Sequence, residues 1–314
     1  MKRLFLTVGM AAGLVSALIG LAGCEKVVEF KVDEVTPYVV LVSKPEADSM
    51  VRIKLSYSRF FLDGHPFRKI SGADLRLYAN GSQVNLLSSD EGHYLFDCRP
   101  QAGDTIAFHL YVPGYQMVQA GTRIPAEPDF EVVETIYDTF TKECQVKVRL
   151  NDPAGRNYYG ISFDGWVKDE YMPTPDTMPR PYSMQFSTSD IVFSDATSID
   201  YMLDQGETKD YGSYLRFSYA LFNCSSHTMV FYLYFPYRND YLLDPEYPVY
   251  VRMTSLSYDR YRYDNTIDKY NEEYSFLSEP TQIHTNVQGG IGIFAASNAK
   301  KIELKPVIKR LQRQ

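Results

Sequence analysis

The sequence predicts a mainly β protein, in which a β-sandwich is followed by a second β-rich domain that carries one amphipathic helix. Three observations support this prediction. Many short segments alternate apolar and polar residues with a period of two, which is the pattern of a half-buried strand. Turn-forming residues separate these segments at short intervals, as they do in all-β domains. Only residues 257–276 space their apolar side chains as an amphipathic helix does.

The first domain is predicted over residues 37–125. Residues 51–55 and 74–78 alternate apolar with charged side chains, and Asn80-Gly81 then predicts a hairpin, because this pair favours the positive φ angles of a tight turn. Further strands are expected at 39–42, 84–87, 93–96, 106–112 and 116–124. Strands at this spacing predict an immunoglobulin-like β-sandwich, although the Cys–Trp–Cys core of antibody domains is missing.

The second domain is predicted over residues 129–305, after a linker that contains Pro125 and Pro128. Residues 171–182 contain four prolines, which predicts a long irregular loop. The strands of this domain are expected at 130–137, 144–150, 158–167, 215–221, 229–235, 249–256, 282–287, 289–295 and 301–304.

The predicted helix near 257–276 has two faces, and we expect Pro280 to end it. Its apolar face is formed by side chains at positions i, i+4, i+7 and i+11, namely Tyr263, Ile267, Tyr270 and Tyr274. A second face carries acidic side chains that we expect to be solvated, namely Asp264, Asp268 and Glu272.

Residues 1–23 have the layout of a secretory signal peptide. Lys2 and Arg3 precede an apolar run that is short for a bilayer span, and small residues follow it. Leu21-Ala22-Gly23-Cys24 matches the bacterial lipobox, which implies cleavage before Cys24 and diacylation of its thiol. Acyl chains, at about 0.8 kcal/mol per buried methylene, would then anchor a tether of residues 24–36 to the membrane. The alternatives are an uncleaved anchor, or an ordinary signal peptide followed by a chance cysteine.

Charge and cysteine usage exclude some classes of function. Removing residues 1–23 takes the formal charge from −7 to −9, because this segment holds two basic residues and no acidic one. A net acidic chain argues against nucleic acid as the partner. The remaining cysteines are not spaced as zinc ligands, and we expect them to be small core residues; one disulfide stays open as an alternative. They are Cys98, Cys144 and Cys224.

The closing segment resembles the signature of the DUF4249 family of Bacteroidetes lipoproteins. In that family a tyrosine-rich helical segment leads to an acidic-Pro pair, here Glu279-Pro280, and then to a glycine-rich run. The run here is Ile283-His284-Thr285-Asn286-Val287-Gln288-Gly289-Gly290-Ile291-Gly292-Ile293-Phe294. The lipobox and earlier motifs fit as well, so the resemblance covers essentially the whole mature chain. Those earlier motifs are Gly72-Ala73, Gly103-Asp104-Thr105 and Ile124-Pro125-Ala126-Glu127-Pro128.

The resemblance implies a cellular location for the protein and does not imply a chemical reaction. The family has no known biochemical function, and its members are similar to outer-membrane lipoproteins encoded beside TonB-dependent transporters of the SusC type. It therefore implies a lipid-anchored outer-membrane protein that docks on such a transporter or handles its cargo, and it transfers no catalytic residue. Glu25-Lys26-Val27-Val28-Glu29 matches the acidic surface-export signal imperfectly. Exposure at the cell surface is therefore implied less strongly than outer-membrane location.

No motif in the sequence predicts catalysis, a metal or a cofactor. Residues 290–295 fit Gly-x-Gly-x-x-Ala, but only 19 residues follow Ala295, too few for the rest of a dinucleotide-binding unit. We interpret these glycines as positions of close backbone packing. Residues 160–165 miss the nucleophile elbow Gly-x-Ser-x-Gly by one position. The five histidines, namely His65, His93, His109, His227 and His284, are not paired at metal-ligand spacing.

Aromatic residues give the candidate interface. The chain has 26 tyrosines and one tryptophan, and tyrosine combines a large contact area with a polar tip. Most single tyrosines fill β cores, but a loop on a rigid sheet is a common contact surface. We therefore select three residues beside or within the proline-rich loop as the candidate interface, namely Trp166, Tyr171 and Tyr182.

These observations favour a non-enzymatic, outer-membrane lipoprotein anchored through Cys24. It would serve a TonB-dependent, SusC-like uptake system as an accessory or substrate-binding component, with a ligand that the sequence does not name. The alternatives are a cell-surface glycan or peptide hydrolase whose site is not local in sequence, and a purely structural envelope lipoprotein.

Overall fold

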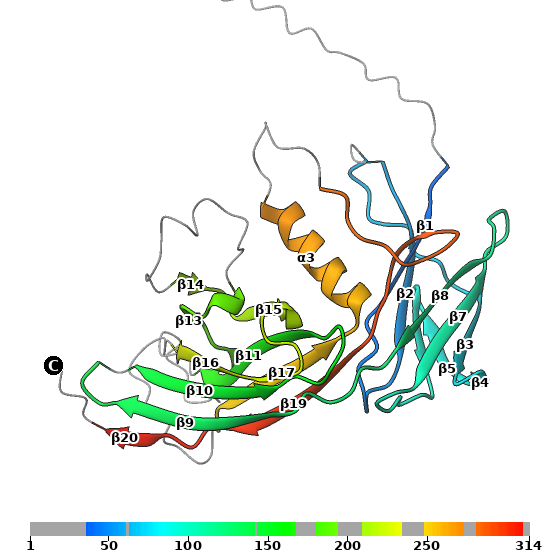
Figure 1. Cartoon of the computed structure of the whole chain (residues 1–314). Helices are drawn as coiled ribbons and strands as arrows, with labels where there is room; N and C mark the ends of the chain where they lie inside the picture. The colour runs from blue at the N-terminus through cyan, green and yellow to red at the C-terminus, as the bar shows by residue number, and fades with distance from the viewer. Residues whose placement is uncertain are drawn as a thin grey trace, which may run out of the picture. The chain divides into compact units, whose positions relative to one another are not determined.

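The computed structural model describes residues 36–60, 63–141, 143–167, 180–193, 209–233, 248–272 and 281–309. From Pro37 onward these residues belong to one compact unit. The mainly β prediction with one α-helix is confirmed over the described residues (Figure 1). Cys24 and the predicted signal peptide and tether lie outside them, apart from Thr36 at the end of the tether.

Two sheets pack face to face in the N-terminal region. Their strands are β1 (Val39–Ser43), β2 (Arg52–Tyr57), β3 (Asp74–Ala79), β4 (Ser82–Val84), β5 (Leu86–Asp90), β6 (His93–Phe96), β7 (Thr105–Tyr111) and β8 (Val118–Arg123), joined by β18 (Ile291–Phe294). The sheet orders are β18-β1-β2-β6-β5 and β4-β3-β7-β8. Alternate side chains of each sheet enter one core, as Ile53 from β2 and Phe108 from β7 illustrate.

The Asn80-Gly81 hairpin is confirmed, because both residues have positive φ angles, of 50° and 82°, between the paired strands β3 and β4. The prediction of a single strand at residues 84–87 is wrong, because this segment contains parts of two strands. Val84 ends β4 and Leu86 begins β5, and these strands belong to different sheets. The chain passes from one sheet to the other at Asn85, the polar residue that interrupts this apolar segment.

The glycine-rich segment near residue 290 returns to the N-terminal sandwich. β18 lies parallel to β1, with Val40 opposite Ile291, although the sequence placed this segment with the second domain. Gly292 has a φ of +121°, and a side chain there would overlap the carbonyl oxygen of Leu41. The interpretation of close backbone packing is therefore confirmed.

The strand predicted at residues 282–287 does not form. Instead, the side chain of Asn286 accepts a hydrogen bond from the Phe294 N–H (2.9 Å) and donates one to the Phe294 carbonyl (2.8 Å). This amide thus occupies the backbone groups that a neighbouring strand would pair with.

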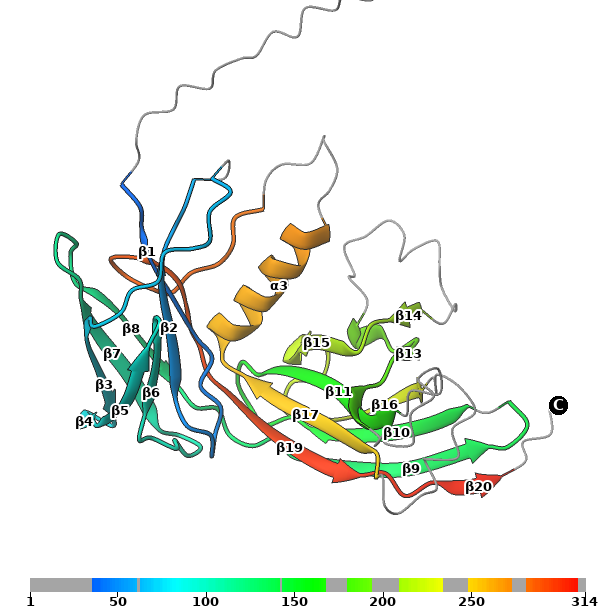
Figure 2. The same cartoon turned by 180° about the vertical axis from the view of Figure 1, so that it is seen from behind.

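The C-terminal region is also built from two sheets, with orders β14-β13-β16-β10-β9-β20 and β12-β11-β17-β19, and with β15 paired to β11 (Figure 2). The strands are β9 (Phe130–Asp138), β10 (Cys144–Asn151), β11 (Tyr158–Val167), β12 (Arg180–Ser183), β13 (Phe186–Thr188), β14 (Lys209–Tyr211), β15 (Tyr214–Ser218), β16 (Ser226–Leu233), β17 (Tyr250–Leu256), β19 (Ser297–Glu303) and β20 (Val307–Lys309). Side chains of both sheets form a second core, in which the rings of Phe163, Phe186 and Phe231 meet edge to face.

Three predicted boundaries in this region differ from the structure. The end of the predicted proline-rich loop forms strand β12. β12 is an edge strand, and Pro181 is tolerated there because one side of the strand needs no backbone donor. Residues 168–179 of the loop region lie outside the described part. The strand predicted at 215–221 ends at Ser218, and a 3-10 turn follows over Tyr219–Leu221. The last predicted strand begins earlier, at Ser297.

The predicted helix is confirmed as α3 (Tyr258–Glu272), with residues 273–280 outside the described part. Its faces differ from the prediction. Tyr270 of the expected apolar face is 56% exposed, whereas Asp264 of the expected solvated face is 8% exposed. Asp264 is buried because basic side chains surround its carboxylate, as described below.

The prediction that all three cysteines are core residues is wrong. Cys144 is fully buried, Cys98 is half-buried and Cys224 is exposed, and all three are free thiols in the structure. Cys224 lies in a turn with a φ of 59°, where the chain bends at the surface before β16.

Candidate functional site

A cleft of about 910 Å³ is lined by segments far apart in the sequence. One wall comes from residues 121–129, at the end of β8 and in the linker. The facing residues come from the turn between β10 and β11 and from the junction of β17 with α3. Its chemically distinctive lining residues are Arg123, Asp129, Asp152, Arg156, Tyr158 and Tyr258.

A cluster of tyrosines forms one side of the cleft. Tyr158, the first residue of β11, stacks on Tyr261 with ring centroids 4.7 Å apart, and it lies 5.5 Å from Tyr258. Tyr219 meets the Tyr158 ring edge to face at 6.2 Å. Burial raises the pKa of the Tyr158 hydroxyl, so this group stays a neutral donor and acceptor. Tyr258 lines the cleft and is 50% exposed.

Hydrogen bonds hold two of the acidic residues of the cleft, Asp152 and Asp129, in place. Asp152 is buried and accepts hydrogen bonds from the Tyr159 hydroxyl (2.6 Å) and the Cys224 N–H (3.3 Å). Burial, together with the nearby Asp152 carboxylate, raises the pKa of Tyr159. Asp129 accepts a hydrogen bond from the Asn151 amide at 3.1 Å. These bonds hold acceptors in fixed positions, which is what an oriented polar site requires.

Together, the basic residues of the cleft make fewer hydrogen bonds than its acidic residues Asp152 and Asp129. Arg123 donates from Nε to the Gly103 carbonyl at 3.1 Å. Arg156 is exposed and has no hydrogen-bond or ion-pair partner among the described residues. The cleft therefore combines free donors, fixed acceptors and aromatic faces, and Leu256 is its one large aliphatic lining residue among those described. This composition suits a polar ligand with a flat apolar face better than a lipid.

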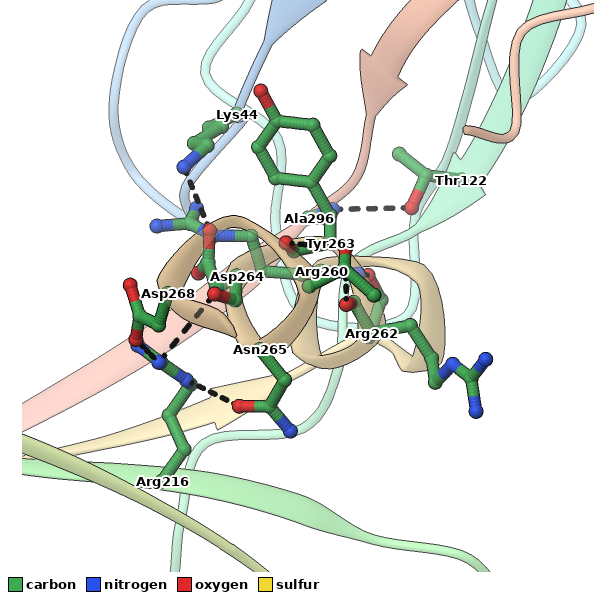
Figure 3. Close-up of polar contacts among 12 residues, drawn as sticks. Lys44, Thr122, Arg216, Arg260, Arg262, Tyr263, Asp264, Asn265, Asp268 and Ala296 are labelled. Atoms are coloured by element: carbon green, nitrogen blue, oxygen red, sulfur yellow. Dashed lines mark hydrogen bonds and ion pairs between the residues drawn. The ribbon is translucent and has the colours of Figure 1, made fainter. Parts of the chain in front are cut away.

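A charge cluster positions the helix that begins at the cleft (Figure 3). Asp264 of α3 accepts hydrogen bonds from Lys44 Nζ (2.7 Å) and Arg260 Nε (2.6 Å). Burial alone would raise the pKa of Asp264, but Arg260 and Lys44 outweigh it and hold the pKa below its usual value. Arg216 of β15 donates to Asn265 at 2.7 Å and pairs with Asp268.

The structure brings together two of the three predicted interface residues, in a different pocket. Trp166 and Tyr182 line a pocket of about 370 Å³ beside Tyr250 and the ion pair between Lys301 and Asp164. The Trp166 indole donates to the Pro248 carbonyl at 3.2 Å. Tyr171 lies outside the described residues. The role of these residues as an interface stays a prediction.

Among the described residues, the other candidates for acid–base chemistry are two pairs of a histidine and an aspartate. His227 lies 3.0 Å from Asp190, and His284 lies 2.8 Å from Asp259. The described part of the chain holds no group of three or more potential metal-ligating side chains. In the same part of the chain, α3 and the shorter turns are not long and apolar enough to span a membrane.

The fold and the cleft define a mainly β protein with two face-packed sheet pairs and a polar, tyrosine-rich cleft. The chain belongs to the DUF4249 family, described as a domain of unknown function, whose model matches residues 25–303. No match to the sequence was found among curated proteins.

Two matching solved structures are only distantly similar to this chain. A β-glucuronidase of Bacteroides uniformis has 11% identity and a TM-score of 0.20, over 65% of this chain and 30% of that chain. A β-glucuronidase from glycoside hydrolase family 2 has 7% identity and a TM-score of 0.19, over 86% of this chain and 20% of that chain. The chain thus spans less than a third of either enzyme, and similarity at this level carries no argument about activity.

Proposed function

We propose that this chain is a non-enzymatic lipoprotein of the outer membrane, anchored by acylation at Cys24, that binds a polar ligand in the tyrosine-rich cleft. It presents this ligand to a TonB-dependent transporter of the SusC type. The lipobox at Leu21-Ala22-Gly23-Cys24 supports the anchor, and membership in the family is consistent with it.

The cleft is the observation that carries the binding role. Its two guanidinium groups, its fixed carboxylates and the half-exposed ring of Tyr258 converge on one open space of about 910 Å³. Ligand sites are concave and combine a few oriented polar groups with aromatic contact area. Tyrosine, amide and backbone donors hold Asp152 and Asp129, and the His284 ring holds Asp259, so these acceptors are positioned for a ligand.

Two measurements test the anchor and the partner separately. Metabolic labelling with palmitate should label the wild-type chain, and the Cys24→Ala chain should take up no label. Affinity purification of the detergent-extracted, labelled protein should recover a large β-barrel transporter. Labelling of Cys24→Ala at the wild-type level would place the acyl chains on another residue and contradict the anchor at Cys24. A labelled protein that purifies alone, or that cleaves a polymer, would exclude the accessory role.

A further inference from the structure

One end of the N-terminal sandwich exposes a set of large apolar side chains. Each of them is at least 37% exposed, and most are aromatic. We call this set the loop-end patch, and it consists of Tyr38, Phe60, Phe67, Tyr111, Met117 and Ile291.

Strand register explains why these residues share one end. β1 and β18 are parallel and begin together, with Val40 opposite Ile291, and antiparallel β2 ends beside them, with Val39 opposite Tyr57. In the facing sheet, β7 ends at Tyr111 and β8 begins at Val118. The loops that follow β2 and β7 therefore emerge at the end where β1 begins (Figure 2).

Contacts hold these loops together. The Tyr38 N–H donates to Ser58 Oγ at 2.8 Å, which ties the start of β1 to the loop after β2. The ring centroids of Tyr57 and Tyr115 lie 5.6 Å apart and join the end of β2 to the turn between β7 and β8. A pair of backbone hydrogen bonds between Gln119 and Gln288 adds the segment before β18.

Guanidinium groups lie over aromatic rings at the same end. Arg59 lies 4.5 Å from the ring centroid of Phe67, Arg68 lies 4.1 Å from that of Tyr57, and Arg76 lies 5.5 Å from that of Tyr111. Aromatic rings with adjoining basic groups suit the membrane interface, where rings enter the boundary of the acyl chains and guanidinium groups reach the phosphates.

The chain enters the sandwich at this end, so the position of the lipid anchor indicates what the loop-end patch contacts. Extended residues 25–36 span at most about 40 Å, so acylation at Cys24 keeps the start of β1 within about 40 Å of the headgroups, close enough for this end to reach the bilayer. We infer, resting on the proposed acylation at Cys24, that the loop-end patch docks on the bilayer surface and inserts Phe60 and Phe67 into its interface. The rings lie just before β1, in the loop after β2 and at the end of β7, so they surround the point of chain entry, an arrangement that suits a lipid surface.

Tryptophan quenching tests this docking in the full, lipidated protein. The protein is reconstituted into vesicles of phosphatidylethanolamine and phosphatidylglycerol, with or without brominated acyl chains. Phe67→Trp and Phe60→Trp place a reporter in the patch. Leu87→Trp is the matched control, because Leu87 is 52% exposed in β5 and lies near the opposite end of the same sandwich. The native Trp166 gives the baseline, and thermal unfolding checks that each variant is folded.

We expect brominated lipid to lower the added fluorescence of Phe67→Trp and Phe60→Trp about twofold and to leave that of Leu87→Trp unchanged. Vesicle flotation without quenching at residues 60 and 67 would overturn the docking, leave the anchor intact and favour a protein partner for the patch. Protein that fails to float with vesicles would overturn both the anchor and the docking.

Discussion

Lys44 and Asp264 are 220 positions apart in the sequence, and their side chains meet at 2.7 Å between Nζ and Oδ1. Lys44 follows the first strand of the N-terminal sandwich, and Asp264 lies in the middle of α3. The first turn of α3 supplies Tyr258 and Asp259 to the cleft. This ion pair therefore couples the N-terminal sandwich to the helix that completes the candidate site.

Replacing Asp264 should destabilise the protein. Asp264→Asn leaves Lys44 and Arg260 partly buried without a countercharge, and we expect a loss of about 2–4 kcal/mol in the free energy of unfolding. Urea denaturation measures this loss. The matched control is Asp268→Asn, because the Asp268 side chain is 50% exposed; it should cost less than about 1 kcal/mol. Equal losses in the two variants would contradict a special role for Asp264.

The same carboxylate should give stability a defined pH dependence. The pKa of Asp264 is lower in the folded protein than the ordinary aspartate value of 3.8, so its contribution to stability is complete above that value and is lost as pH falls through the folded pKa. The difference in unfolding free energy between wild type and Asp264→Asn should be constant from roughly pH 5 to neutral pH and shrink below pH ~4. A difference that grows on acidification would refute this sign.

Gly292 should not tolerate a side chain. Its φ of +121° and the overlap of an added Cβ with the Leu41 carbonyl would push β18 away from β1. We expect Gly292→Ala to cost at least about 2 kcal/mol, measured by thermal unfolding. Gly121→Ala in β8 is the control, because its new Cβ would meet only ordinary contacts, at 3.5 Å or more. If Gly292→Ala melted at the wild-type temperature, β18 would not lie as close to β1 as described.

The cysteines should react with thiol reagents in the order of their exposure. Burial raises the pKa of Cys144 to about 12, so its thiol should resist alkylation at pH 8 until the protein unfolds. Exposed Cys224 should be labelled first and half-buried Cys98 more slowly, because burial also raises the pKa of Cys98. Mass spectrometry of timed alkylation gives the order, and early labelling of Cys144 would contradict the structure.

Local patterns predicted most elements but not their partners. The period-two alternation in β2 and the Asn80-Gly81 turn are read from adjacent residues, and both are confirmed. The pairing of β18 with β1 depends on residues some 250 positions apart, so no local signal reveals it. The end of the proline-rich loop became β12 for a similar reason, since pairing with β11 outweighs the turn propensity of Pro181.

The site was harder to predict than the fold. The tyrosines of β11 and α3 were evident as separate groups, but their contact depends on the fold that brings Tyr158 to Tyr258. Asp264 was predicted to be solvated, because its i+4 spacing to Asp268 resembles an exposed acidic face. One partner, Arg260, lies four residues earlier on the same helix, which is a local signal that the prediction did not use. The other partner, Lys44, lies 220 residues away, and the pattern around the helix cannot reveal it.

Ligand retention by the cleft tests the central claim most directly. Wild-type protein purified from its native membrane should carry a polar small molecule detectable by native mass spectrometry, and Tyr258→Ala and Arg156→Ala should lose it. Tyr270→Ala is the matched control, because Tyr270 is similarly exposed on the same helix and does not line the cleft. Retention of that molecule by wild type and Tyr270→Ala alone is the predicted result. Equal retention by Tyr258→Ala, or none by the wild type, would contradict binding in this cleft.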